Sequence, residues 1–440
     1  MSGPSQFAPF APLLGLLLGL LCLLAAMRAG RRRRLVDNLP TSRTTGVFIG
    51  LVELKGAAEA EHPLVSHLAG RACVQYAWSV QERWSRTVTE TYTDANGKTQ
   101  TRTRHESGWT TVASGGEMIP FFLKDDEGVI RVMPMGATLQ PLGIFDVTCG
   151  MGDALYYGKG PQGAVPNSDF RRRFSETGIP LHTPLYVMGQ ARERDDIVAA
   201  EIAEDKNAPM FLISTRSEEQ VSSGFAWAYI GWGIFGGVLG LAGIFARERM
   251  LNLESPFVPA YALVAGGYAM AWFLAWVWMV YNSMIDLRQR VNQGWSQVDV
   301  QLKRRFDLIP NLVKTIQGLR DYEQNLQVEL ASLRAQSLAT PPGEPGPDYR
   351  ACSKTLVAIA ERYPEIKAHE SFLNLQKNLA DTEQRIALAR SYFNDIATFY
   401  NTRLEIVPDR FIAVLAGMKQ RTLMAANEFE RAPVVVELAS

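Results

Sequence analysis

The stretch YNSMIDLRQRVNQGWSQVDVQLKRRFDLIPNLV, residues 281–313, carries apolar side chains at a spacing of seven residues. One row contains Met284, Val291, Val298, Leu312 and Leu319, and a companion row contains Trp295, Leu302, Ile309 and Ile316. Residues seven apart lie on the same side of a helix, and two neighbouring rows are typical of coiled-coil-like packing. The stretch therefore predicts a long helix whose apolar face is buried against other helices.

A second apolar row follows further along the chain. It keeps alternating spacings of three and four residues through Phe372, Leu375, Leu379, Thr382, Ile386, Ala389, Phe393, Ile396 and Tyr400. Two shorter helical patterns lie between the rows, at 322–338 and 349–363, separated by the breaker TPPGEPGP. Four helices with short connections predict an antiparallel all-α bundle over residues 282–416, with a tail over 417–440.

The stretch quoted first and the stretch YPEIKAHESFLNLQKNLADTEQRIALARSYFNDIATFYNTR, residues 363–403, together resemble the bacterial LemA family. The resemblance covers about residues 281–413. It implies a membrane-tethered helical bundle, and it supplies no catalytic residue to transfer to this chain.

Arg305 falls on the seven-residue row between Val298 and Leu312. Burying an unpaired cation is costly, so the side chain must either extend to solvent or meet an acid. Counting along an antiparallel pair of helices predicts that Arg304 or Arg305 meets Asp381 or Glu383. Pro310 predicts a bend in the helix because proline removes a backbone donor and clashes one turn earlier. The alternative for this basic stretch is lipid or ligand binding.

Three uncharged apolar runs are each close to the length that crosses a bilayer, at residues 8–27, 225–246 and 257–281, and with Arg28 the first forms an expected anchor over residues 8–28. In the first, the basic cluster Arg31–Arg34 follows the apolar segment, which favours an uncleaved anchor over a signal peptide. Basic residues prefer the cytoplasmic side. We therefore expect an N-terminus outside, an external loop over residues 247–256, and both remaining regions in the cytoplasm of a multi-pass bacterial inner-membrane protein.

The apolar runs themselves indicate what the membrane part does. They contain no Asp, Glu, Lys, Arg or His, which disfavours a channel or pump. Small residues recur four apart, in the pairs Gly233 with Gly237, Gly236 with Gly240, Ala262 with Gly266, and Gly267 with Ala271. This spacing lets helices approach closely. It predicts packing within the helical hairpin, with homodimerisation as the alternative.

Residues 35–221 are rich in strand-forming residues. Residues 87–104 alternate Thr with charged residues around an Asn96-Gly97 turn, so we expect a hairpin arm that projects into solvent. A second hairpin is expected to turn at Asp125–Gly128. The segments PLYVMGQARE, DIVAAEIAED and PMFLISTR predict three further strands.

The candidates for metal or catalytic chemistry are weak. Asp125, Asp126 and Glu127 favour a solvated turn over a cation site, and His62, His67, His105 and His182 have no metal-ligand spacing. Cys22, Cys73, Cys149 and Cys352 are scattered, and no GxSxG, P-loop or HExxH motif occurs. Acids and bases balance at 45 each, which gives no charge signal for nucleic acid. We predict no catalytic, cofactor-binding or metal-binding residues and no cofactor.

The order of GLVELKG, LAGRACVQYAWSVQER, IPFFLKDDEGVIRVMP, ETGIPLHTPLYVMGQARE and PMFLISTRSEEQ resembles the GIDE, or beside-a-membrane, domain. That domain also occurs in a mitochondrial membrane-anchored ubiquitin ligase, whose chemistry resides in a separate RING domain with metal-binding cysteines. This sequence has no such cysteine set, so we expect no ubiquitin transfer.

These observations predict a non-enzymatic scaffold or interaction protein that presents a β-rich module and a helical bundle at the membrane. The expected partners are membrane lipids, other membrane proteins, or further copies of the chain as a homo-oligomer. The alternative is a membrane-associated enzyme or enzyme regulator with a site between the two modules.

Overall fold

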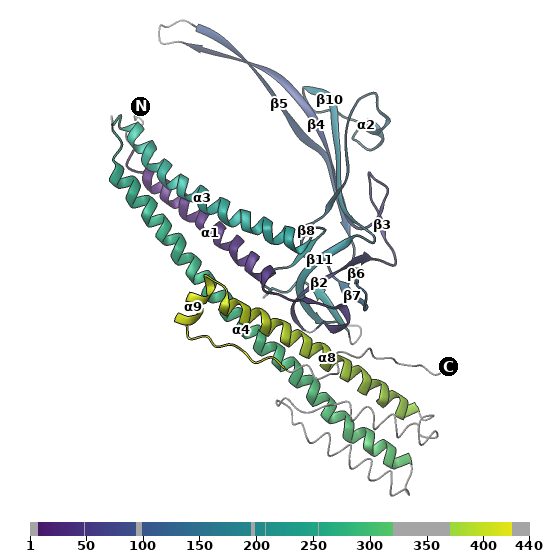
Figure 1. The fold of residues 1–440 in the computed structure, drawn as a ribbon. Coiled ribbons are helices and arrows are strands. Elements are labelled where there is room, and N and C mark those ends of the chain that lie inside the picture. Colours follow the sequence, from purple (N-terminus) through teal and green to yellow (C-terminus); the bar gives the residue numbers. More distant parts are fainter. Residues whose placement is uncertain are drawn as a thin grey trace. The chain divides into compact units, whose positions relative to one another are not determined.

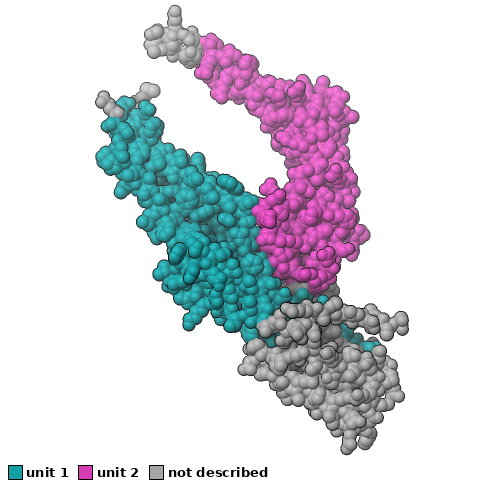
Figure 2. Space-filling view, viewed as in Figure 1, with its two compact units in different colours: residues 1–40, 221–440 teal, residues 41–220 magenta. Residues whose placement is uncertain are grey.

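A computed structural model describes residues 8–47, 49–93, 99–194, 199–206, 208–253, 255–319 and 370–424. The chain divides into two compact units, coloured separately in Figure 2. Unit 1 consists of Met1–Pro40 and Val221–Ser440, and unit 2 consists of Thr41–Gln220. Unit 2 is thus one continuous piece of chain inserted between two parts of unit 1.

A closed ring of strands forms the centre of unit 2. In ring order the strands are β2 (Gly50–Glu59), β6 (Phe121–Lys124), β7 (Val129–Val132), β12 (Ala200–Ala203) and β11 (Pro184–Glu193). β7 pairs with β12 in parallel, and the other neighbours, β11 and β2 included, pair antiparallel. By chain order the ring runs first, second, third, fifth, fourth, which is the connectivity of an OB-fold barrel.

The barrel is filled by apolar side chains that alternate along its strands. Val52 and Leu54 of β2 point inward with residues from every other strand of the ring, and the cluster includes Leu123, Ile130, Val132, Val187 and Ile202. Short strands extend the sheet beyond the ring: β1 (Thr41–Ser42) lies on β2, β13 (Leu212–Ser214) on β11, and β8 (Thr138–Gln140) on β13. The hairpin predicted around Asp125–Gly128 is confirmed as β6 and β7.

A second sheet contains the predicted arm. Its order is β3 (Leu64–Val65), β4 (Ala72–Thr93), β10 (Ser168–Pro180) and β9 (Leu142–Gly150), with β5 (Thr99–Met118) also paired to β4. β10 pairs with β4 only as far as Trp84, whereas β5 accompanies β4 to Thr93. The end of the hairpin is therefore two-stranded and extends beyond the sheet, as Figure 1 shows, which confirms the predicted arm. The Asn96-Gly97 turn lies outside the described residues.

Among its described residues, unit 1 contains three helices that are long and apolar enough to cross a membrane: α1 (Ala11–Asp37), α3 (Glu218–Met250) and the first part of α4 (Val258–Leu319). Glycines bring them together, because a Cβ at Gly19 would lie 2.8 Å from the carbonyl oxygen of Gly236. Tyr268 of α4 donates to the carbonyl oxygen of Gly233 at 2.8 Å. The predicted packing of α3 against α4 is confirmed, but it is made through the Tyr268 and Trp272 side chains, and the close backbone approach at glycines is between α1 and α3. Gly266 and Gly267 have open space beside them.

The loop between α3 and α4 is fixed by one carboxylate. Glu248 accepts hydrogen bonds from the Phe257 amide at 2.8 Å and from the Tyr261 hydroxyl at 2.6 Å. The acceptor therefore lies at the first turn of α4, where backbone N–H groups lack helical partners.

Helix α4 does not end where the apolar residues end. The whole helix is 62 residues long and continues past the apolar run, through Pro310, into the region predicted to form the bundle (Figure 1). The predicted bend at Pro310 stays a prediction. The sequence indicated a boundary at residue 281 because composition changes there, but no helix breaker lies at that point.

Helix α8 (Glu370–Glu405) packs antiparallel against this extension of α4. The Trp295 and Phe393 rings meet with centroids 5.5 Å apart. The described members of the predicted rows that are buried are Met284, Val291, Val298, Leu302, Ile386, Ala389, Phe393, Ile396 and Tyr400. The side chains of Ile309, Leu312, Ile316 and Leu319 lie outside the described ones. Phe372, Leu375 and Leu379 and the two shorter predicted helices lie outside the described side chains and residues. The antiparallel four-helix bundle therefore stays a prediction beyond the α4–α8 pair.

Candidate functional site

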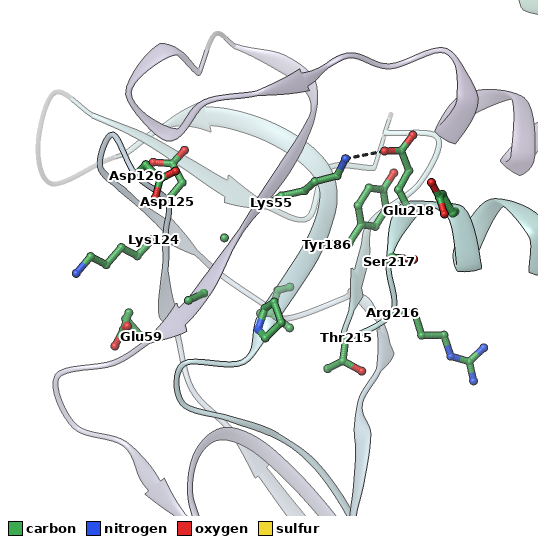
Figure 3. A pocket seen from close by; sticks show the side chains of 15 residues that line it. Lys55, Glu59, Lys124, Asp125, Asp126, Tyr186, Thr215, Arg216, Ser217 and Glu218 are labelled. Carbon is green, nitrogen blue, oxygen red and sulfur yellow. Dashed lines mark hydrogen bonds and ion pairs between the residues drawn. The ribbon is translucent and has the colours of Figure 1, made fainter.

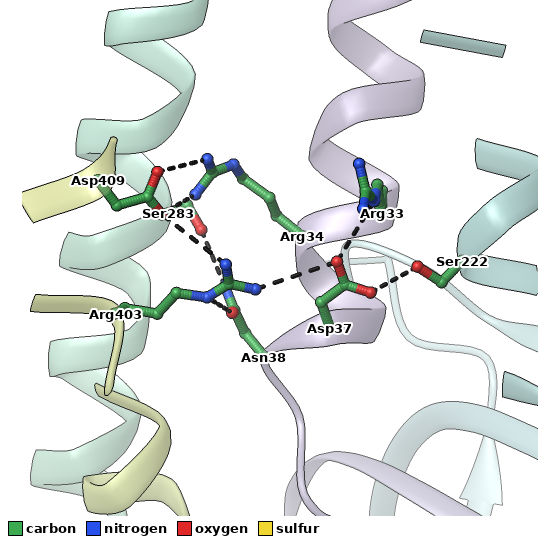
Figure 4. Close-up of polar contacts among 8 residues, drawn as sticks. All are labelled: Arg33, Arg34, Asp37, Asn38, Ser222, Ser283, Arg403 and Asp409. Carbon is green, nitrogen blue, oxygen red and sulfur yellow. Dashed lines mark hydrogen bonds and ion pairs between the residues drawn. The ribbon is translucent and has the colours of Figure 1, made fainter. Parts of the chain in front are cut away.

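A network of charged and polar side chains lies at the carboxyl end of α1, directly after the apolar run (Figure 4). Arg34 donates two hydrogen bonds to Asp409, at 2.9 and 3.0 Å, from α1 to the short helix α9 (Asp409–Leu415). Arg403 of α8 donates to the Asn38 side chain at 2.8 Å and lies 3.9 Å from Asp409. We call these residues, with the further contacts below, the polar clamp.

Two more helices join the polar clamp. Ser222 of α3 donates to Asp37 at 2.6 Å, and the Asn38 amide donates to Ser283 of α4 at 3.0 Å. Arg33 and Arg403 also approach Asp37, at 3.4 and 4.0 Å. The ends of α1 and α8, the starts of α3 and α9, and the middle of α4 thus share one set of polar contacts.

The electrostatics of the polar clamp depend on its two acids. Burial lowers the pKa of the Arg403 guanidinium and the charge of Arg34 lowers it further, whereas Asp409 and Asp37 raise it. Asp409 is itself buried, so removing it would leave two arginines close together without their main counter-charge. The sequence indicated a role for Arg34 in orienting the anchor, but it gave no signal for Arg403 or Asp409, which lie in a different part of the chain.

A second candidate site is a cleft in unit 2 with a volume of about 1000 Å³ (Figure 3). It is bounded by the outer face of β2, the turn between β6 and β7, the start of β11, and residues 215–219. Both acidic and basic side chains line the cleft. The acids are Glu59, Asp125, Asp126, Glu218 and Glu219, and the bases are Lys55, Lys124 and Arg216. Lys55 donates to Glu218 at 2.7 Å across the cleft, so part of this charge is neutralised internally.

Glu53 lies on β2 beside this cleft and is fully buried. It accepts hydrogen bonds from Thr41 at 2.7 Å and from Tyr186 at 2.8 Å, and the Lys55 ammonium lies 3.7 Å away. Burial raises the pKa of the Glu53 carboxyl to about 7, assisted by repulsion from Glu218 and opposed by Thr41, Tyr186 and Lys55. Glu53 is thus a buried group that titrates near neutral pH.

The acidic turn of the cleft is a structural feature of the barrel. Asp125 accepts from the Thr44 amide at 2.8 Å, from the Thr44 hydroxyl at 2.6 Å, and from the amides of Glu127 and Gly128. Burial raises the pKa of Asp125, but these hydrogen bonds outweigh it, and the net shift is downward. The carboxylate therefore holds the turn against residues 44–46, consistent with the predicted preference for a turn over a cation site.

The histidines and other acids are dispersed. His67 stacks on Trp78, His105 contacts Thr87, and His182 contacts Glu59. In the part of the chain that the structure describes, no group of three or more His, Cys, Asp or Glu side chains could hold a metal ion.

A buried ion pair in the second sheet organises a loop. Arg172 and Glu82 are fully buried, with guanidinium and carboxylate 3.0 Å apart. Arg172 also donates to the carbonyl oxygens of Tyr156, Pro161 and Gly163. The side chain closes the loop that precedes β10, and its role is architectural.

The predicted pairing of Arg305 stays a prediction. The side chains of Arg305 and Glu383 lie outside the described residues, and Arg304 and Asp381 are both exposed. The register of α4 against α8 is compatible with a pairing of Arg305 and Glu383. Trp295 lies against Phe393, so ten residues further along α4 and ten back along α8 bring residue 305 level with residue 383.

Along the chain, a unit with a strand barrel is joined to a unit that contains a packed helical pair and three helices long and apolar enough to cross a membrane. Residues 294–438 match the LemA family model, and residues 89–245 match the GIDE model, which is described as an E3 ubiquitin ligase. The chain therefore joins a GIDE region to a LemA-family region, as its sequence resemblances indicated. The LemA match continues past residue 416, the boundary expected for the bundle.

Among characterised relatives, magnetosome protein MamQ of Magnetospirillum gryphiswaldense is 24% identical over 178 residues, which covers 34% of this chain and 65% of that protein. Magnetosome proteins MamQ 1 and MamQ 2 of Paramagnetospirillum magneticum are each 22% identical over 208 residues, which covers 40% of this chain and 76% of theirs. The chain thus spans less than two thirds of the length of the first of these relatives.

Proposed function

We propose that this protein is a non-enzymatic scaffold, anchored in the bacterial inner membrane by three helices, that presents its GIDE barrel and its LemA helices to other proteins in the cytoplasm. The observation that carries the proposal is the continuity of α4, which runs from the candidate membrane span into the α4–α8 pair without a break. A module joined to its anchor by an uninterrupted helix is held at a fixed height and orientation, which suits a docking surface better than a mobile tether does.

The polar clamp supports the same proposal. The clamp fixes α8 and α9 to the end of α1 through Asp409, Arg34 and Arg403. Helix α8 is therefore held to the proposed membrane anchor, as α4 is by its continuity. Both GIDE and LemA regions are proposed to contact membrane proteins, with self-association as a further arrangement.

Photo-crosslinking in native membranes tests this proposal. A photoreactive amino acid is placed at Val129 on the barrel and at Leu373 on α8, two side chains that are 58% and 46% exposed. A scaffold is expected to give a small, reproducible set of protein adducts from each position, identified by mass spectrometry. Adducts that merely follow protein abundance, at both positions, would contradict it.

A matched pair of variants tests whether the polar clamp matters for docking. Asp409→Ala removes a buried acid from the clamp, whereas Asp381→Ala removes an exposed acid from the same region of the chain. We expect the adducts at Leu373 to change in Asp409→Ala and to persist in Asp381→Ala. Equal adduct patterns in both variants would show that the clamp does not position the docking surface.

A further inference from the structure

Helix α9 presents an apolar face that the described chain leaves uncovered. Phe411, Val414 and Leu415 are 64%, 70% and 89% exposed, and their spacing of three and four residues puts them on one side of the helix. Ile412 and Ala413 are buried on the other side. Ile406 and Val407, which precede α9, are also exposed, at 43% and 63%.

The chain that follows α9 turns away from this face. Gly417, at φ 62°, ends the helix, and the Met418 amide donates to the Ala413 carbonyl oxygen at 3.0 Å. The next residues return along α8, where Asn401 exchanges two hydrogen bonds with the backbone of Arg421, each at 2.8 Å. Asn394 does the same with Met424, at 3.0 and 2.8 Å. Residues 418–424 are therefore fixed on α8 instead of covering α9.

The position of α9 along the apolar helices indicates what covers its face. The Arg31 guanidinium, four residues past the end of the first apolar run, lies 4.2 Å from the centre of the Trp278 ring, so this part of α1 is level with the last turn of the third apolar run. Arg34, which holds Asp409 at the start of α9, is three residues further along α1, or about 4.5 Å at the rise of an α-helix. Polar headgroups occupy roughly 5–8 Å on each side of a bilayer core, so α9 begins at headgroup depth.

The charges around α9 suit the same environment. Arg31, Arg32 and Arg33 are exposed at the end of α1, and Arg410 is exposed on α9 itself. A short helix with apolar side chains on one face and cations beside it is attracted to anionic headgroups and buries its apolar face at the acyl boundary.

We propose that the α9 face formed by Phe411, Val414 and Leu415, together with Ile406 and Val407, inserts into the headgroup region of the bilayer that the three apolar helices cross. α9 is then an interfacial amphipathic helix that attaches the LemA helices to the bilayer surface. The bidentate contact of Asp409 with Arg34 sets the rotation of α9 about its own axis. This inference rests on the membrane anchoring that is part of the proposed function.

Lipid crosslinking from α9 tests the inference. The full chain is reconstituted into nanodiscs of phosphatidylethanolamine and phosphatidylglycerol, with benzoylphenylalanine in place of Phe411 or, separately, of Leu415. The Leu415 position is useful because its side chain makes little contact with the protein and its replacement should not disturb folding. After irradiation, lipid adducts on each labelled peptide are quantified by mass spectrometry.

Two reference positions make the outcome decisive. Phe273, 56% exposed on the apolar part of α4, is the positive control, and Leu423, 51% exposed on the segment that returns along α8, is the negative control. We expect the yield of lipid adducts at residues 411 and 415 to approach the yield at residue 273. It should exceed the yield at residue 423 by about tenfold, because residues 411 and 415 would face lipid and residue 423 would face solvent.

Each other result overturns the inference. Protein–protein adducts at 411 and 415 in place of lipid adducts would identify the α9 face as a contact with a second copy of the chain. Lipid adducts at 273 alone would leave the membrane anchoring intact and refute the interfacial role of α9. If no lipid adducts formed at residue 273 either, the membrane anchoring would be refuted, and with it both proposals.

Discussion

Glu53 is the residue for which a change of pH has the clearest consequence. Its pKa is raised from 4.5 to about 7 by burial, so between these values the folded protein holds a proton that the unfolded chain has released. Stability therefore falls as the pH rises through this range, and the loss is complete above pH 7. The full effect corresponds to about 3 kcal/mol, because each pKa unit is worth roughly 1.4 kcal/mol.

Glu53→Gln should remove this pH dependence, since an amide stays neutral. We expect the variant to be more stable than the parent at pH 8 and nearly equal to it at pH 5, as measured by hydrogen exchange of the β2 peptide in the full chain during urea unfolding. Glu59→Gln is the matched control on the same strand, because Glu59 is partly exposed and bonded to His182. A stabilisation of Glu53→Gln that is the same at both pH values would contradict the assignment.

At the scale of elements, the sequence predicted the helices and hairpins whose patterns are local. The described members of the seven-residue rows of α4 and of the row on α8 are largely buried as expected, because a regular repeat of apolar residues places them on one face of each helix. The arm was recognisable because Thr and charged residues alternate on both sides of a turn signal. No fact from a distant part of the chain was needed for either.

Strands β9 and β10 were not predicted, because what stabilises them comes from distant parts of the chain. β10 contains Arg171–Arg173 and a buried Glu176, a polar composition that does not resemble an interior strand. Its charges are matched by distant groups: Arg172 pairs with Glu82, and Glu176 accepts from the amides of Leu68 and Ala69. The polar clamp escaped prediction in the same way, because Arg34 and Asp409 are separated by 375 residues.

The α4–α8 register makes the pairing of Arg305 a sharper prediction. Residue 305 is level with residue 383 when the chain is counted from the Trp295–Phe393 contact, so Glu383 is favoured over Asp381, which is exposed. If the Arg305 side chain is buried, Arg305→Ala should destabilise the chain by about 3 kcal/mol because the acid loses its partner. Removing both charges should cost less than the sum of the single changes.

A double-mutant cycle of Arg305→Ala and Glu383→Ala, measured by chemical unfolding of the detergent-solubilised chain, gives the interaction free energy directly. The matched control is a cycle of Arg304→Ala with Asp381→Ala, two exposed side chains for which near-additivity is expected. Additivity in the Arg305 cycle would mean that its charge reaches solvent or another group.

For the whole molecule, the proposed function depends on the orientation in the membrane, because the orientation decides which partners a scaffold would meet. Asp37, Ser222 and Ser283 share the polar clamp, so the carboxyl ends of the apolar parts of α1 and α4 and the start of α3 lie at one end of the three helices. Whichever way these helices insert, the segments that follow residues 40 and 283 leave on the same side. The loop after α3 lies at the other end.

The basic residues at the polar clamp predict that this end is cytoplasmic. A cysteine introduced by Asn252→Cys, in the loop between α3 and α4, should react with a membrane-impermeant thiol reagent in intact cells. One introduced by Asn96→Cys, in the turn of the arm, should react only after permeabilisation. Cys22, Cys73 and Cys149 are buried, and the parent chain gives the background that includes Cys352. Labelling at 96 without labelling at 252 would reverse the orientation, and labelling at both in intact cells would contradict the arrangement of the helices, because the two positions are expected on opposite faces of the bilayer.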